Sequence, residues 1–143
     1  MSKITFIGAG STVFAKNVLG DCMRTPALQG FELALFDIDL QRLKDSENML
    51  NNLKRSSGST CIVKAYTDRK EALKGAKYVI NAIQVGGYDP CTITDFEIPK
   101  KYGLRQTIAD TVGIGGIFRN LRRSPSCWTL RPISAKCART PCS

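Results

Sequence analysis

The residues of this sequence that could do chemistry begin at a glycine-rich turn near the N-terminus. Gly8-Ala9-Gly10-Ser11 follows an apolar run at residues 3–7 and precedes a helical pattern at residues 12–24. Gly8 allows a tight turn, and Gly10 has no side chain to keep a ligand away from the backbone. The start of the next helix adds free N–H groups and the positive end of its dipole, and the Ser11 hydroxyl adds a donor. These features favour binding of a pyrophosphate.

A carboxylate follows the second predicted strand. Asp37 comes directly after residues 32–36, where it could accept hydrogen bonds from ribose hydroxyls and would repel the 2′-phosphate of NADP. The spacing therefore predicts NAD as cofactor. The expected cofactor contacts are Gly8, Gly10, Ser11, Thr12 and Asp37. Each feature alone has a plainer interpretation, since Gly-x-Gly is often only a turn and Asp37 could simply cap a helix. The third glycine of the dinucleotide fingerprint is absent, and Val13 stands in its place.

Alternating strands and helices must position these residues. Strands are predicted at residues 3–7, 32–36, 61–66 and 77–83, and helices at 12–24, 40–55 and 117–122, with a short helix opening at 67–71. Residues 84–90 are predicted to form a loop. The apolar face of the first helix is assigned to Val13, Phe14, Val18, Leu19 and Cys22. The order predicts an α/β fold, a Rossmann-like doubly wound parallel sheet that is truncated and lacks the catalytic domain.

Composition excludes several other classes. The formal charge is +9, but all 12 acidic residues lie at or before Asp110, and residues 1–122 mix acids with bases. This pattern is typical of a solvated surface, so we expect no nucleic-acid partner. The six cysteines have no zinc-site spacing and the chain has no histidine, so no metal ligand is assigned. There is neither a long apolar run nor a secretory signal, so we expect no membrane partner and a cytoplasmic location.

Three longer strings narrow the function. They are ITFIGAGST at residues 4–12, NAIQVGGYDP at 81–90 and QTIADTVGIGGI at 106–117. They resemble the NAD-dependent family-4 glycoside hydrolases, and most closely the bacterial α-galactosidases of that family. The resemblance covers residues 1–122, which we interpret as the N-terminal NAD-binding domain of a longer enzyme.

The resemblance implies chemistry that differs from the usual pair of carboxylates. Bound NAD would take a hydride from C3 of the sugar, a tyrosine would remove the C2 proton, and the aglycone would leave by elimination. A divalent metal, typically Mn²⁺, would polarise the C3 oxygen. By resemblance, Asp110 supports the basicity of the tyrosine, although it could merely cap a turn. Gly86 and Gly87 would let the backbone approach the nicotinamide, or form a simple turn. Thr92 stands where members acting on phosphorylated sugars tend to carry arginine, which favours an unphosphorylated α-galactoside.

The resemblance ends after Arg122. Residues 123–143 are basic and rich in cysteine and proline, and prolines at 125, 132 and 141 are expected to prevent a continuous helix. We interpret this segment as an irregular tail of frameshifted or foreign origin, with a basic interaction tail as the alternative. Arg119 and Arg122 are expected to face solvent. The family's metal ligands and catalytic tyrosine come later in its members, so neither is assigned here, and this truncated chain is expected to be inactive.

Two other functions stay open at this point. An NAD-dependent hydroxy-acid dehydrogenase would share the nucleotide fold, and the chain could also be a non-catalytic nucleotide-binding fragment. The truncated sheet is expected to leave an apolar face uncovered, which would favour aggregation or oligomers. The substrate is expected to be a small glycoside, and the full-length enzyme a homo-oligomer.

Overall fold

The computed structural model describes residues 2–106 and 113–137, with side chains described as far as Cys127. The chain divides into two compact units. The first unit comprises Met1–Ala82 with Pro132–Ser143, and the second unit comprises Ile83–Arg131. We describe each unit by itself. Asp110 lies outside the described residues.

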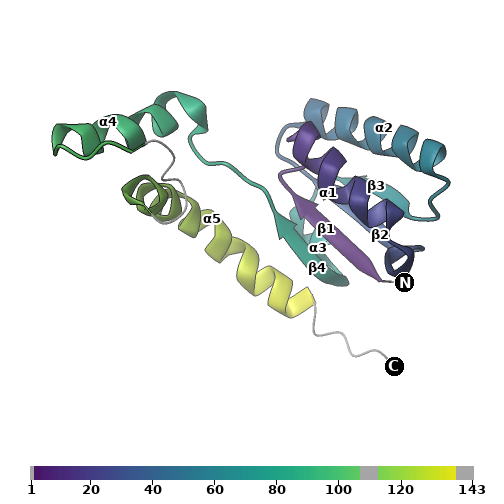
Figure 1. Ribbon diagram of the computed structural model, residues 1–143. Coiled ribbons are helices and arrows are strands. Elements are labelled where there is room, and N and C mark those ends of the chain that lie inside the picture. The colour runs from purple at the N-terminus through teal and green to yellow at the C-terminus, as the bar shows by residue number, and fades with distance from the viewer. Residues whose placement is uncertain (1, 107–112, 138–143) are drawn as a thin grey trace. The chain divides into compact units, whose positions relative to one another are not determined.

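Strands and helices alternate through the first unit, as predicted, and helices make up the second (Figure 1). The elements are β1 (Lys3–Ile7), α1 (Thr12–Arg24), the short η1 (Pro26–Leu28), β2 (Glu32–Phe36), α2 (Leu40–Ser57), β3 (Ile62–Tyr66), α3 (Arg69–Leu73), β4 (Ala76–Asn81), η2 (Gly87–Thr92), α4 (Ile93–Lys101) and α5 (Ile114–Cys137).

The first unit is a four-stranded sheet in the order β3-β2-β1-β4, and every neighbouring pair is parallel. In the register, Ile7 at the end of β1 lies beside Phe36 of β2 and Asn81 of β4. The residues that follow these strands therefore emerge at the same edge of the sheet. A sheet that begins in this order and places its crossovers on both faces is the first half of a doubly wound fold, so the predicted fold class is confirmed.

The two faces of the sheet have different coverings. Alternate residues of β1 and β2, such as Phe6 and Leu35, join a fully buried cluster with Leu19 of α1 and Leu50 of α2. On the opposite face the Thr5 hydroxyl donates to the carbonyl of Ala72 in α3 over 2.7 Å. Helices α1 and α2 therefore cover one face, and α3 contacts the other.

Helix α1 buries only part of the apolar face predicted for it. Leu19 is fully buried, and Val18 and Cys22 pack against the core, as predicted, but the first two apolar residues do not. Val13 is 69% exposed and Phe14 is 61% exposed, whereas Ala15, Leu19 and Met23 are buried. The buried residues are spaced by four, which places them on one side of the helix, and Val13 and Phe14 lie outside that side. The missing third fingerprint glycine has the same explanation. Position 13 points away from the helix–strand contact, so valine is tolerated there.

The last part of the described chain also departs from the prediction. Residues 123–137 are not irregular, because α5 continues through Pro125 and Pro132 to Cys137. A proline removes one backbone hydrogen bond and crowds the preceding turn, which disfavours a helix but leaves the bonds of the other residues in place. The Ser124 hydroxyl adds a bond of 2.7 Å to the Asn120 carbonyl just before Pro125. The frameshifted or foreign origin of this segment stays a prediction.

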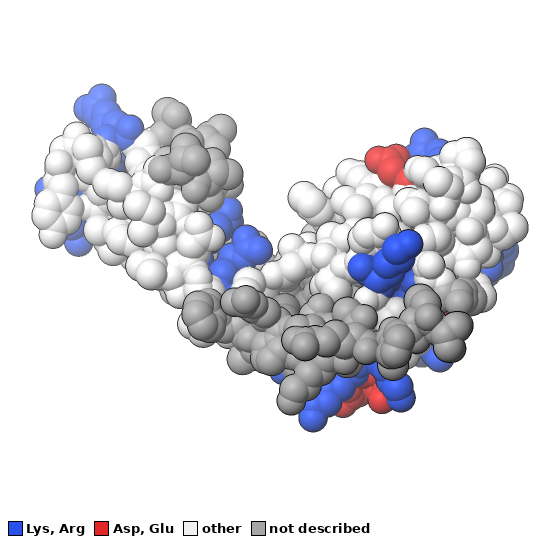
Figure 2. Space-filling view, turned by 90° about the horizontal axis from the view of Figure 1, so that it is seen from below, with Lys and Arg blue, Asp and Glu red and all other residues white. Residues whose placement is uncertain are grey.

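The distribution of charge on the surface and the character of the helices are relevant to the expected absence of nucleic-acid and membrane partners. On the face drawn in Figure 2, basic side chains form separate groups, and acidic side chains lie next to some of them. No helix in the part of the chain that the structure describes has the length and apolar character needed to cross a membrane. The absence of a nucleic-acid partner and the cytoplasmic location stay predictions.

A buried lysine joins the α3 face of the sheet to the end of α3. The Lys3 ammonium donates to the carbonyls of Glu71 and Lys74 over 3.0 and 3.2 Å, and it forms an ion pair of 3.5 Å with Glu32. The Tyr66 hydroxyl donates to the same Glu32 carboxylate. Burial and then this hydrogen bond raise the pKa of Tyr66 to about 12.

The raised pKa of Tyr66 predicts a loss of stability in alkali. Tyrosine in the unfolded chain has a pKa of 10.0, so between pH 10.0 and about 12 the folded state holds a proton that the unfolded state has lost. The stabilisation by Tyr66 is therefore complete below this window and declines as the pH rises through it. We expect Tyr66→Phe to be less stable than the wild type near neutral pH, with the gap narrowing through the window. Urea unfolding at several pH values measures the gap, with Tyr102→Phe as an exposed control. A gap that is constant with pH would contradict the prediction.

Candidate nucleotide-binding site

The glycine-rich turn is held against the end of the neighbouring strand. Gly8 has a φ of 89°, a conformation that favours glycine. This turn directs the N–H groups of Gly8 and Ala9 to the Phe36 carbonyl, over 2.9 and 3.1 Å. The first strand–helix junction is therefore fixed by the backbone of β2 before any side chain contributes.

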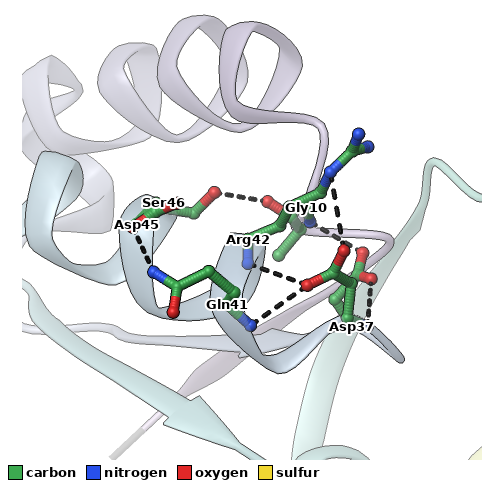
Figure 3. A network of polar contacts seen from close by, with 8 residues as sticks. Gly10, Asp37, Gln41, Arg42, Asp45 and Ser46 are labelled. Carbon is green, nitrogen blue, oxygen red and sulfur yellow. Dashed lines mark hydrogen bonds and ion pairs between the residues drawn. The ribbon is translucent and has the colours of Figure 1, made fainter.

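Asp37 lies directly against the turn (Figure 3). One carboxylate oxygen accepts the Gly10 N–H over 2.7 Å, and the other accepts the Asp39 N–H over 2.9 Å. A Cβ atom on Gly10 would lie 2.9 to 3.1 Å from the Asp37 carboxyl group. Gly10 is therefore required for the approach of Asp37, a reason that the sequence argument did not contain. A carboxylate accepts about four hydrogen bonds, so Asp37 retains capacity for ribose hydroxyls.

The N-terminus of α1 differs from those of α2 and α3. Asp39 accepts two backbone N–H groups at the start of α2, and Asp68 does the same for α3. Ser11 occupies the cap position of α1 but makes no capping bond with its side chain. The Thr12 N–H bonds back to the Gly10 carbonyl. The first turn of α1 therefore presents N–H groups that no side chain caps, and these can bind an anion.

Sequence reasoning missed a support beneath the turn. Ser46 of α2 is fully buried, and its hydroxyl donates to the Ala9 carbonyl over 2.6 Å (Figure 3). A signal was present, because Ser46 falls on the same helical face as the buried Leu43 and Leu50. A polar residue on an apolar face must find a partner, and here the partner is the turn itself.

Gly86 and Gly87 belong to the second unit. Gly86 has a φ of 88°, and a Cβ atom on it would lie 2.1 Å from the Cys91 sulfur. Gly87 has a φ of 64°, but a Cβ there would meet nothing within 4 Å. The predicted loop at 84–90 is in part helical, since η2 begins at Gly87. The need for glycine at position 86 is explained by this turn, and contact of either glycine with the nicotinamide stays a prediction.

Substitution of Gly86 tests whether the turn that contains it requires glycine. We expect Gly86→Ala to destabilise this unit by about 2 kcal/mol, because both the left-handed backbone and the Cys91 side chain oppose a Cβ atom. Gly87→Ala meets only the backbone penalty and is the matched control, with a smaller expected loss of about 1 kcal/mol. Cys91→Ala should recover the difference between the two. Equal losses for both glycines in chemical denaturation would contradict this account.

Arg122 is not the solvent-facing residue that was predicted. Its two terminal nitrogens bind the two oxygens of the Asp95 carboxylate, which is only 5% exposed. These hydrogen bonds raise the pKa of Arg122. The Asp95 carbonyl accepts from the Gln106 amide, whose oxygen accepts the Gly115 N–H over 3.0 Å. Arg119 is likewise half-buried and makes contacts. The expectation failed because the partner of Arg122 comes from α4, a distant helix that the sequence pattern did not predict.

A metal centre does not fit the described residues. Among them there is no group of three histidine, cysteine or acidic side chains placed to hold an ion, and the sequence has no histidine. A nucleotide does fit, because the Gly10 turn leaves backbone exposed beside an uncapped helix and a carboxylate.

Comparison with known proteins decides between the nucleotide-binding classes. The sequence model of the family 4 glycosyl hydrolases matches residues 3–136. The chain belongs to this family. The match extends past Arg122, where the resemblance appeared to end from the sequence. The predicted membership in family 4 is therefore confirmed, and it disfavours the hydroxy-acid dehydrogenase alternative.

Individual family 4 proteins support this membership. The chain is 68% identical over 125 residues to an α-galactosidase of Bacillus subtilis (strain 168), covering 87% of this chain and 29% of that protein. The crystal structure of lplD from Bacillus subtilis superimposes with a TM-score of 0.82 at 29% identity, over 96% of this chain and 31% of that one. A 6-phospho-β-glucosidase from Thermotoga maritima, solved with manganese, NAD⁺ and glucose-6-phosphate, gives 0.76 at 28% identity, over 95% and 32%. The chain thus spans about a third of these proteins, and NAD and manganese are found in the family.

Proposed function

We propose that this chain is the NAD-binding part of an α-galactosidase-like family 4 enzyme that cleaves O-glycosides. The observation that carries the proposal is the junction of β1 and α1, where Gly10 exposes backbone, α1 is uncapped and Asp37 lies one strand away. Identity of 68% to the Bacillus subtilis α-galactosidase supports the substrate class. An unphosphorylated α-galactoside agrees with Thr92, whose hydroxyl is bonded to the Gly87 carbonyl within its own turn.

Each residue of the junction has a distinct part in binding NAD. The backbone at Gly8 and Gly10 would admit the pyrophosphate, and the N–H groups at the start of α1, with the Ser11 and Thr12 hydroxyls, would donate to it. Asp37 would hold the adenosine ribose and exclude a 2′-phosphate. NAD supplies the hydride acceptor for C3 of the sugar when it is bound. This chain's residues hold and orient the cofactor, so that its affinity and its preference for NAD over NADP are set here.

The remaining parts of the reaction depend on residues that the described chain does not provide. The described residues do not fit Mn²⁺, so no step is derived through the metal. Asp110 is proposed to support the base that removes the C2 proton, and Gly86 and Gly87 to admit the nicotinamide end of the cofactor. A cytoplasmic location and a homo-oligomeric full-length enzyme complete the proposal.

Two measurements test the proposal at two levels. Calorimetry on the chain should show NAD binding tighter than NADP binding, and a folded chain that binds neither would refute the proposal.

For the activity, residues 1–122 should replace the matched segment of the Bacillus subtilis α-galactosidase. We expect this chimera to hydrolyse a nitrophenyl α-galactoside only with NAD⁺ and Mn²⁺ present. A folded chimera that binds NAD but stays inactive, beside an active parent enzyme, would show that this segment does not serve an α-galactosidase.

A further inference from the structure

Two buried hydroxyl groups in the first unit have the same local chemistry but different positions. Ser46 and Thr5 are both 0% exposed, and each donates to an alanine carbonyl, over 2.6 Å to Ala9 and 2.7 Å to Ala72. Thr5 connects β1 to α3, away from the glycine-rich turn. Ser46 connects the middle of α2 to the turn, 37 residues earlier in the chain.

The Ser46 bond holds the one residue between the two fingerprint glycines. The Ala9 side chain is 0% exposed, its N–H bonds to the Phe36 carbonyl, and its carbonyl bonds to Ser46. The next residue, Gly10, bonds through its N–H to Asp37. Both peptide groups that flank Ala9 are therefore fixed by different elements, and the peptide between Ala9 and Gly10 is held at its two ends by α2 and Asp37. Without the Ser46 hydroxyl this peptide loses one of the two bonds that fix its rotation.

We infer that Ser46 is a positioning residue for the cofactor, which sets the orientation of the Ala9–Gly10 peptide against which the pyrophosphate packs. The inference rests on the proposed NAD binding. Ser46 itself is buried on the core side of the turn, so it acts through the backbone and makes no contact with the ligand. A turn that is fixed before binding loses less freedom when the ligand arrives, which is the source of the expected affinity.

The experiment compares Ser46→Ala with Thr5→Val in the full chain. Each variant removes one buried donor to a carbonyl, so both should lower the urea midpoint by similar amounts. Calorimetry, under conditions in which each variant is folded, should show a Kd for NAD about tenfold higher in Ser46→Ala and unchanged in Thr5→Val. ADP-ribose, which contains the pyrophosphate but lacks nicotinamide, should lose the same factor. Adenosine, which lacks the pyrophosphate, should bind the wild type and Ser46→Ala equally.

Each outcome has a defined meaning. If Ser46→Ala is destabilised but binds NAD as the wild type does, Ser46 is structural and the inference is wrong. An equal loss for adenosine would also overturn it, since the effect would then not pass through the pyrophosphate. If Ser46→Ala does not fold, Ser46→Cys replaces the hydroxyl with a slightly larger thiol that is a weaker donor, and it should show an intermediate Kd; an unchanged Kd there overturns the inference. A wild-type chain that is folded but fails to bind NAD refutes the proposed function, and the inference with it.

Discussion

Replacing Gly10 with valine is expected to raise the Kd for NAD by about a hundredfold or more, equal to about 2.7 kcal/mol of binding free energy. The reason is geometric. The first atom of any side chain at this position would lie 2.9 Å from an oxygen of Asp37, so the carboxylate or the turn must move. Either movement breaks the 2.7 Å bond between the Gly10 N–H and Asp37, and the larger side chain fills the space beside the backbone. The ribose and pyrophosphate contacts are then lost together.

Calorimetry with NAD measures this loss. A double variant separates the collision with Asp37 from the loss of the contact that Asp37 makes with the ribose. In Gly10→Ala combined with Asp37→Ala the collision is absent, so the free energy of unfolding should recover relative to Gly10→Ala alone, while NAD binding stays weak. Gly75→Asn is the matched control, because Gly75 lies in an open turn at the other edge of the sheet and a Cβ there meets nothing within 4 Å. A folded Gly10→Val variant with the NAD affinity of the wild type would disprove the binding site.

Replacing Arg122 with methionine is expected to destabilise the second unit by about 2 kcal/mol, less than for a fully buried pair because the Arg122 side chain is 27% exposed. Asp95 is 5% exposed and its carboxylate is bound through both oxygens by Arg122. Removal of the guanidinium leaves a buried negative charge without its partner, which costs far more than the loss of an exposed ion pair. The pair also connects α4 to α5, so its loss should loosen both helices.

Urea unfolding followed by circular dichroism at the wavelength of the helix signal measures this loss. Asp95→Asn in the Arg122→Met background removes the unpaired charge, so the double variant should recover part of the stability. Arg105→Met removes an exposed arginine of the same unit and should change the free energy of unfolding by less than about 0.5 kcal/mol. An Arg122→Met variant as stable as Arg105→Met would contradict the importance of the pair.

The sequence located the first unit well because its signals are local. The strands at residues 3–7 and 32–36 and the helix at 12–24 have the predicted bounds. Apolar runs, a glycine turn and the Thr25-Pro26 stop all act within a few residues of one another. The second unit was predicted poorly. Helix α4 was missed and α5 was cut short, because Pro99, Pro125 and Pro132 lie inside these helices and weaken any pattern based on propensity.

The features of the candidate site also fall into those that local sequence signals predicted and those that only the structure revealed. The sequence by itself determined which residues stand at the ends of the strands, and hence that Gly8, Gly10 and Asp37 meet at one edge of the sheet. Only the tertiary structure decided that Asp37 bonds to Gly10, that Ser46 holds Ala9, and that Arg122 pairs with Asp95. The physical reason is that strand order follows from local patterns and the rules of parallel connection, whereas the partner of a buried polar group is set by whichever distant element packs against it.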